Sequence, residues 1–301
     1  MGNHGKPDNQ SRPVITQEMI DLYDDFTHRS FDRRQFMERL AALAGSASAA
    51  TAAAAMMAAS AQAAGMVAED DARLTARTVS FGGGSGPMSG YLVMPAERSG
   101  PLPGVIVVHE NRGLVPHIRD VARRVALEGF VALAPDFLTP LGGTPADEDA
   151  ARPMFGQLVR EDVAANGIAA IEWLRSQPET NGRIGATGFC WGGGTVNAMA
   201  THSPDLLAAV PYYGGQPPAD EVPKIRARMM LHYAGLDERI NAGIPDFKAA
   251  LDAAGIDYQM FVYEGVNHAF NNDTSEARYD KAAAELAWSR TVAFFKETLT
   301  G

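Results

Sequence analysis

A single cysteine, Cys190, lies between two glycines in the segment Gly188-Phe189-Cys190-Trp191-Gly192. This spacing is typical of a nucleophile elbow, the strained turn between a strand and a helix that lifts a nucleophile above a sheet. Glycines are needed because a Cβ atom two residues before or after the nucleophile would collide with neighbouring backbone. The N-terminus of the following helix would also stabilise a thiolate. We therefore predict that Cys190 is a catalytic nucleophile; the alternative is a buried structural cysteine.

The base that serves this thiol is expected in a loop after a strand, where parallel sheets place their reactive side chains. His268 lies in such a loop. His202 falls about three turns along the helix that follows Cys190, which is too far from the sulfur. His232 falls inside a predicted strand, as a core histidine would. His268 is therefore the predicted base.

The acid that orients this imidazole should lie between the nucleophile and the histidine in the chain, as in other enzymes with this elbow. Asp237 comes just after a predicted strand and could hold the far ring nitrogen of His268. Glu238 is the alternative, and Asp246 lies further along, in the next predicted helix. Asp237 is the predicted acid.

A second polar loop, His109-Glu110-Asn111-Arg112, follows an apolar run that predicts a strand buried on both faces. We expect the backbone N–H groups of Asn111 and Trp191 to form an oxyanion hole, which would stabilise the charge that develops on a carbonyl oxygen. Glu110 would lie beside the nucleophile. The alternative for Glu110 is a surface carboxylate at the tip of a loop.

The elements that must position these residues alternate between strand and helix patterns from residue 72 to the end of the chain. Such alternation predicts an α/β fold, with a mostly parallel sheet covered by helices on both faces. Strands are expected at residues 78–81, 90–94, 105–109, 130–134, 183–187, 208–212, 228–233 and 258–263. Helices are expected at 118–128, 161–174, 191–201, 245–254 and 281–299. Residues 72–301 are thus predicted to form one domain.

The composition narrows the possible functions. The chain has 301 residues, of which 46% are hydrophobic, as is usual for a globular protein with a real core. A formal net charge of -10 argues against general binding to nucleic acid, because the phosphates would repel it. His, Asp and Glu residues show no metal-ligand spacing, so no metal or other cofactor is expected.

Residues 1–64 differ from the rest and resemble an export leader. Arg33-Arg34 precedes a stretch without charged residues at 40–68, and Ala61-Gln62-Ala63 has the A-x-A pattern of a cleavage site. This predicts a twin-arginine signal and a periplasmic or secreted protein. The alternatives are an alanine-rich surface helix or a membrane span, and a cytoplasmic protein if the leader does not function. Alanine contributes little to membrane insertion, so no stable span is expected after processing.

Taken together, these residues resemble the dienelactone hydrolase family of α/β-hydrolases over about residues 75–299. The resemblance rests on the elbow, the Asp237 segment, the Glu110 loop, Pro135-Asp136 and Asn267-His268-Ala269-Phe270. It implies an α/β-hydrolase fold and hydrolysis of a small ester or lactone, typically a carboxymethylene butenolide, without a metal. It also implies that Glu110 pairs with the resting thiol and takes its proton as substrate binds. Cys190 would then form a thioester, which water activated by His268 would release.

The resemblance is incomplete in the substrate pocket. The family's best-known members place one arginine soon after the histidine and another after the Pro135-Asp136 strand. In this chain the corresponding residues are 269–273 after His268 and 137–140 after Asp136, and neither segment contains a positive charge. Arg112 is the candidate substitute. Candidates for an aromatic pocket, with core packing as the alternative, are Phe137, Trp191, Tyr212 and Tyr213.

Two functions of other classes stay open beside the hydrolase. One is a non-catalytic member of the fold that binds a ligand. The other is a thiol redox sensor, which would need an external thiol because Cys190 has no second cysteine in the chain to resolve its oxidised form.

Overall fold

The computed structural model describes residues 13–28, 32–58 and 65–301. Its strands are β1 (Leu74–Gly82), β2 (Pro87–Pro95), β3 (Leu102–Val108), β4 (Val131–Asp136), β5 (Thr180–Phe189), β6 (Leu206–Tyr212), β7 (Arg228–Ala234) and β8 (Tyr258–Tyr263). Its α-helices are α1 (Gln17–His28), α2 (Arg33–Ala44), α3 (Ala47–Met57), α4 (Pro116–Leu127), α5 (Glu148–Phe155), α6 (Arg160–Arg175), α7 (Trp191–His202), α8 (Glu238–Asn241), α9 (Ile244–Ala254) and α10 (Lys281–Leu299).

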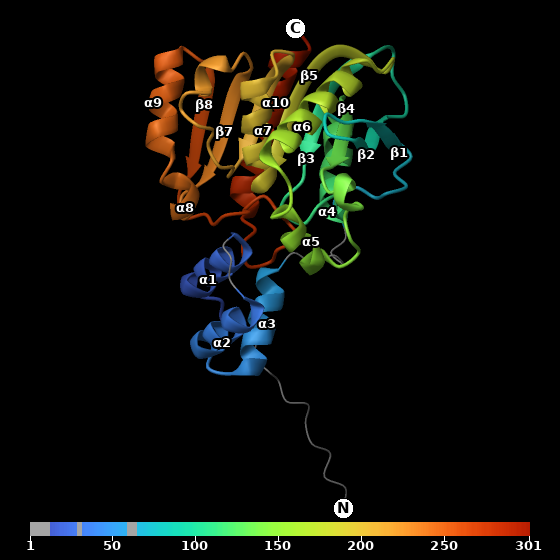
Figure 1. Cartoon of the computed structure of the whole chain (residues 1–301). Coiled ribbons are helices and arrows are strands. Elements are labelled where there is room, and N and C mark those ends of the chain that lie inside the picture. The colour runs from blue at the N-terminus through green and yellow to red at the C-terminus, as the bar shows by residue number, and fades with distance from the viewer. Residues whose placement is uncertain (1–12, 29–31, 59–64) are drawn as a thin grey trace, which may run out of the picture. The chain divides into compact units, whose positions relative to one another are not determined.

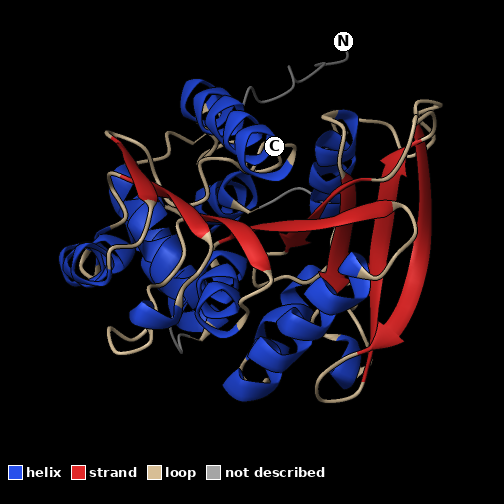
Figure 2. Cartoon of the chain, turned by 90° about the horizontal axis from the view of Figure 1, so that it is seen from above, coloured by secondary structure: helices blue, strands red, loops and turns tan. Residues whose placement is uncertain are grey.

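The eight strands form a single sheet in the order β1-β2-β4-β3-β5-β6-β7-β8 (Figure 1). β2 is antiparallel to both of its neighbours. The strands from β4 to β8 in this order run parallel to one another. The sheet is strongly twisted, with helices on both of its sides (Figure 2). The predicted α/β-hydrolase fold, with a mostly parallel sheet, is therefore confirmed.

The central strand β3 explains why both faces of the sheet are covered. Its side chains alternate in direction, as in any strand, and every one of them from Val105 to Val108 is buried. Val105 and Val107 pack into one apolar cluster with α4 and α10, whereas Ile106 and Val108 pack into a second with α6, α7 and α9. Exclusion of water from both faces holds the strand in place.

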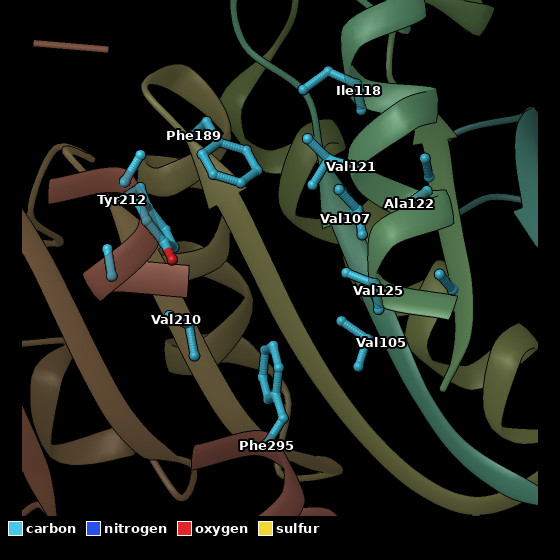
Figure 3. Packing of buried hydrophobic residues seen from close by; sticks show 14 of the residues in the cluster. Val105, Val107, Ile118, Val121, Ala122, Val125, Phe189, Val210, Tyr212 and Phe295 are labelled. Atoms are coloured by element: carbon cyan, nitrogen blue, oxygen red, sulfur yellow. The ribbon is translucent and has the colours of Figure 1, made fainter. Parts of the chain in front are cut away.

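Helix α4 packs directly on the first of these faces. Val121 and Val125 of α4 point toward Val105 and Val107 of β3, and Phe295 of α10 lies on the same face (Figure 3). These side chains are almost completely buried. Because α4 follows the loop at the end of β3, this packing also fixes the loop.

The parallel direction of the strands brings five loops to one edge of the sheet. Glu110, Cys190, Tyr213, Asp237 and His268 follow the carboxyl ends of β3, β5, β6, β7 and β8, respectively. Loops at this edge are where open parallel sheets hold their ligands. The order of the strands therefore gathers residues that are far apart in the sequence.

The chain divides into two compact units. The smaller unit contains α1, α2 and α3 together with Thr274–Arg278, and the larger contains the sheet and its helices. Sequence patterns placed 274–278 in the hydrolase domain of residues 72–301, but such patterns do not detect contacts between distant segments. The predicted cleavage motif at 61–63 lies outside the described residues.

Apolar side chains hold the smaller unit together. The rings of Phe26 and Phe36 stack with their centroids 4.3 Å apart. The segment from the far end of the chain binds to the end of α3, where Ser275 Oγ and Arg278 Nε both donate to the carbonyl oxygen of Met57, at 2.8 and 3.1 Å. The helices α1, α2 and α3 thus form a folded unit with this segment.

None of the described helices is, by itself, long and apolar enough to cross a membrane. α2 and α3 reach the required length and composition only when they are taken together, and they meet at a bend of 108°.

Candidate active site

The turn that carries Cys190 has the geometry of an elbow. Cys190 has φ 57° and ψ −115°, a conformation that a residue with a side chain rarely adopts. The strain is tolerated because the glycines around it let the backbone segments approach closely. A Cβ atom on Gly188 would lie 2.4 Å from the carbonyl oxygen of Gly192, and one on Gly192 would lie 2.4 Å from the carbonyl oxygen of His109. The sequence requirement for both glycines is therefore steric.

Cys190 lies between the end of β5 and the first turn of α7. Its own N–H donates to the carbonyl oxygen of Tyr212 at 3.0 Å, and its carbonyl oxygen accepts the N–H of Gly194 at 3.2 Å. The N–H of Trp191 belongs to the first turn, whose amides have no acceptor within the helix. The side chain of Cys190 is 7% exposed and stands at the N-cap position of α7.

The predicted acid and base form a close pair. His268 Nδ1 and Asp237 Oδ2 are 2.5 Å apart, and both side chains are buried. The other oxygen of Asp237 accepts the N–H of Ile240 at 3.1 Å, because Asp237 also caps the N-terminus of α8. The carboxylate is thereby fixed from two sides. It holds the imidazole in the tautomer with the proton on Nδ1 and leaves Nε2 to accept a proton.

The thiol and the base lie next to each other in the site. Cys190 Sγ and a ring nitrogen of His268 lie within 4.8 Å of each other. The His268 ring also packs on Tyr213, with 4.8 Å between the ring centroids. The structure thus brings together the three residues that the sequence singled out as nucleophile, acid and base.

The two other histidines after the elbow lie elsewhere. His202 is exposed at the end of α7. His232 is completely buried in β7, where its ring nitrogens contact the hydroxyl groups of Tyr263 at 3.0 Å and Thr291 at 3.1 Å. Burial lowers the pKa of His232 to about 3, so this ring is neutral. The interpretation of His232 as a core histidine is confirmed.

Glu110 is buried and makes a specific contact. Its side chain is 8% exposed, and Oε2 accepts a hydrogen bond from Nδ2 of Asn272 at 2.8 Å. The alternative of a surface carboxylate is therefore wrong. The loop that carries Glu110 lies against the elbow, because the carbonyl oxygen of His109 touches Gly192.

A tight turn contains the remaining residues of this loop. The N–H of Gly113, which has φ 81°, donates to the carbonyl oxygen of Glu110 at 3.4 Å. Asn111 and Arg112 are the central residues of this turn, and Arg112 is only 8% exposed. The N–H of Asn111 thus belongs to the loop that contacts the elbow.

His109 supports both the loop and the aromatic side chains near it. Its Nδ1 donates to the carbonyl oxygen of Glu110 at 2.7 Å, and its Nε2 accepts the N–H of Phe137 at 3.1 Å. The ring can donate with one nitrogen and accept with the other only when it is neutral. Burial lowers the pKa of His109 and so favours this neutral form. The ring stacks on Trp191, with 5.4 Å between centroids.

Apart from Tyr213, which packs on His268, the aromatic candidates separate into two groups. Phe137, Trp191 and Phe155 of α5 surround His109 beside the elbow, and Phe155 is 4.8 Å from Trp191 between ring centroids. Tyr212 instead faces the core, where its hydroxyl contacts that of Thr291 at 2.6 Å. Core packing, not a pocket wall, therefore explains the Tyr212 side chain.

Two residues of this site were not found from the sequence. Phe155 lies on a short helix that contains Pro153 and was not predicted. Asn272 lies in the His268 loop, but a lone amide has no pattern that identifies its partner. Only the folded chain brings Asn272 to Glu110, which is 162 residues away in the sequence.

Similarity to known proteins extends over most of the chain. The model of the dienelactone hydrolase family matches residues 88–299. A "Putative carboxymethylenebutenolidase" of Escherichia coli O157:H7 is 34% identical over 247 residues, which cover 77% of this chain and 90% of that protein. The crystal structure of a "Putative Dienelactone Hydrolase" from Klebsiella pneumoniae has a TM-score of 0.69 and 30% identity, covering 74% of this chain and 99% of that one. A dienelactone hydrolase-like promiscuous phosphotriesterase from metagenomic libraries has a TM-score of 0.64 and 26% identity, covering 75% and 99%.

Proposed function

Because the chain belongs to the dienelactone hydrolase family, we propose that it hydrolyses small carboxylic esters or lactones through a thioester on Cys190. One observation carries the proposal. The sulfur of the strained elbow residue and a ring nitrogen of His268 lie within 4.8 Å, and Asp237 holds the other side of this imidazole at 2.5 Å. A buried structural cysteine needs neither the strain nor the oriented base.

In the first half of the reaction, the thiol proton moves to His268 Nε2, and Sγ forms a bond to the substrate carbonyl carbon. The electron pair of the carbonyl bond moves to its oxygen, which the N–H groups of Trp191 and Asn111 stabilise. When the carbonyl re-forms, the bond from carbon to the alkoxy oxygen breaks. That oxygen takes the proton from His268, and a thioester remains on Cys190.

In the second half, His268 takes a proton from water, and the resulting hydroxide forms a bond to the thioester carbon. The carbon–sulfur bond then breaks, and the proton returns to Cys190. With a lactone, the alcohol oxygen released in the first half stays attached to the acyl chain, so a single ring-opened acid leaves. Glu110, in the loop against the elbow, is the second group that could accept the thiol proton.

Turnover by defined variants tests this function. We expect the full chain to hydrolyse p-nitrophenyl acetate and an unsubstituted butenolide, and Cys190→Ala and His268→Ala each to lose about a thousandfold or more of kcat. The exposed His202→Ala is the matched control and should retain full activity.

The same experiment separates the other two classes of function. Equal hydrolysis by all of these proteins would leave a binding role. Modification of Cys190 by peroxide, without any ester turnover, would favour a thiol sensor.

We also propose that the N-terminal residues direct export through Arg33 and Arg34, which lie exposed in the first turn of α2. The test is fractionation of cells that express the full chain. Export predicts the protein in the periplasm and its loss from there in the double variant Arg33→Lys, Arg34→Lys. An unchanged distribution would contradict export through this pair.

A further inference from the structure

The loop after β4 holds the loop that contains Asn111 at two points. Where the Asn111 loop begins, Nε2 of His109 accepts the N–H of Phe137 at 3.1 Å. Where it ends, the N–H of Leu114 donates to Oγ1 of Thr144 at 2.7 Å. Asn111 lies between these two attachments in the chain, so the position of its backbone depends on both of them.

A buried side chain orients the hydroxyl group of Thr144. Asp136, at the end of β4, is 7% exposed, and its Oδ1 accepts the O–H of Thr144 at 2.9 Å. Its Oδ2 accepts the backbone N–H of Thr144 at 2.8 Å. A backbone N–H can only donate, so Oγ1 accepts from Leu114 and gives its own proton to Asp136. Only a residue with a hydroxyl group can make both of these bonds at this position.

The turn after β3 is shaped to receive this hydroxyl group. A Cβ atom on Gly113 would lie 2.2 Å from Oγ1 of Thr144. Gly113 also has φ 81°, a conformation that favours glycine. Thr144 therefore reaches the N–H of Leu114 only because the preceding residue has no side chain.

The other side of the Asn111 loop lies against the elbow. A Cβ atom on Gly192 would lie 2.4 Å from the carbonyl oxygen of His109, so the start of the loop touches the first turn of α7. An oxyanion-hole donor stabilises the transition state only at hydrogen-bond distance from the oxygen that gains charge. Because small displacements of such a donor are costly, the attachment at the end of the loop should affect the reaction.

We propose that Thr144 is a positioning residue, which acts through the N–H of Leu114 to place the N–H of Asn111 in the oxyanion hole. The inference rests on the proposed hydrolase function and assigns a role to a residue that contacts no reacting atom. It separates two properties of the site. Thr144 should affect the stabilisation of the oxyanion, but it should not affect the reactivity of the Cys190 sulfur.

Two reactions of the same sulfur distinguish these properties. Hydrolysis of p-nitrophenyl acetate passes through a tetrahedral oxyanion, whereas alkylation by iodoacetamide displaces iodide from a saturated carbon and forms no oxyanion. Cys190 is the only cysteine in the chain, so alkylation followed by mass spectrometry measures this sulfur alone. We expect Thr144→Val to lower kcat for the ester by about tenfold or more, with little change in KM. Its rate of alkylation should equal that of the wild type.

Two further variants of Thr144 test whether the hydroxyl group is responsible. Thr144→Ser keeps the hydroxyl and should restore most of the ester hydrolysis. Thr144→Ala removes the hydroxyl without adding bulk and should behave as Thr144→Val does. The alanine variant also provides the same test if the valine variant does not fold.

Thr139 provides the matched control, because it is a threonine of the same loop whose hydroxyl group is also hydrogen-bonded. Its Oγ1 donates to the carbonyl oxygen of Asp136 at 2.6 Å and contacts Oγ of Ser89, on β2, at 3.0 Å. Thr139→Val therefore removes hydrogen bonds from the loop after β4 but leaves the bond between Thr144 and Leu114. We expect it to leave both reactions unchanged.

Four results would overturn the inference. The first is a Thr144→Val variant with the kcat of the wild type. The second is a parallel loss of hydrolysis and alkylation, which would show that the whole site is disturbed. The third is an equal loss of hydrolysis in Thr139→Val, and the fourth is a Thr144→Ser variant as slow as Thr144→Val.

The two proposals fail in different ways. If Cys190→Ala abolishes ester turnover but Thr144→Val hydrolyses the ester as the wild type does, the inference fails and the hydrolase function stands. If the wild type hydrolyses neither p-nitrophenyl acetate nor a butenolide, the proposed function fails, and the inference falls with it.

Discussion

Asp237 holds His268 with one carboxylate oxygen, at 2.5 Å from Nδ1, while its other oxygen caps α8 through the N–H of Ile240. One side chain therefore performs a local structural task and orients the base. The two tasks can be separated, because asparagine also caps helices but its amide cannot stabilise an imidazolium as a carboxylate does.

The Asp237→Asn variant should therefore fold normally and react slowly. We expect kcat for p-nitrophenyl acetate to fall by about a thousandfold or more, because the imidazole is held in the wrong tautomer. The thermal midpoint should change by only a few degrees. Glu238→Gln, at the adjacent position, should retain activity; the reverse result would make Glu238 the acid.

The elbow glycines should tolerate no side chain. Gly188→Ala would place a Cβ atom 2.4 Å from the carbonyl oxygen of Gly192, a contact that the rigid backbone cannot relieve. We expect a loss of about 2–3 kcal/mol in the free energy of unfolding, measured with urea. Gly215→Ala is the control, since no atom lies within 4 Å of its added Cβ. Similar stability of the two variants would contradict the close packing of the elbow.

Buried His232 should make the stability fall in acid. Burial lowers its pKa from 6.5 to about 3, with a smaller contribution from Arg290. Between these values the unfolded chain binds a proton that the folded chain does not, so the stability present above pH 6.5 decreases as the pH falls toward 3.

His232 should thus make the free energy of unfolding fall by up to about 1.4 kcal/mol for each pH unit of acidification, and this loss should be absent in His232→Gln. Urea titrations from pH 7.5 to 4.5 measure this slope, and His202→Gln, at an exposed position, should leave it unchanged. An identical dependence of the free energy of unfolding on pH in the wild type and His232→Gln would show that folding does not lower the pKa of His232.

The helices of residues 17–57 should remain associated with the rest of the chain after the connection is cut. Ser275 and Arg278 both donate to Met57, and the Arg278 guanidinium lies 5.0 Å from the Tyr23 ring centroid. A protease site introduced within residues 59–64 allows cleavage of the full chain. We expect the N-terminal fragment to co-elute in gel filtration, and to be released in the double variant Ser275→Ala, Arg278→Ala.

The exposed Lys281→Ala is the control for this cleavage and should retain the fragment. Immediate release from the wild type would mean that residues 17–57 behave as a separable leader. Retention of the fragment would instead show that these helices serve as a lasting part of the folded protein.

The sequence predicted the elbow and the Asp237–His268 pair because each is marked by local residue types at the end of a strand. Gly188 and Gly192 are a local sequence signal of the strained turn at Cys190. The alternation of strand and helix patterns predicted the fold. Contacts between distant loops leave no such local mark. The Glu110–Asn272 bond and the contacts of Met57 with Ser275 and Arg278 depend on three-dimensional packing, so they became visible only in the structure.

Trapping of the covalent intermediate tests the central claim most directly. The full chain is mixed with p-nitrophenyl acetate, quenched in acid within the first turnover, digested and analysed by mass spectrometry. The thioester mechanism predicts an acetyl group on the peptide that contains Cys190, formed at the rate of p-nitrophenol release and absent in Cys190→Ala. The mechanism would be contradicted if the wild type turned over without acetylation of Cys190 and Cys190→Ala hydrolysed the ester at an undiminished rate.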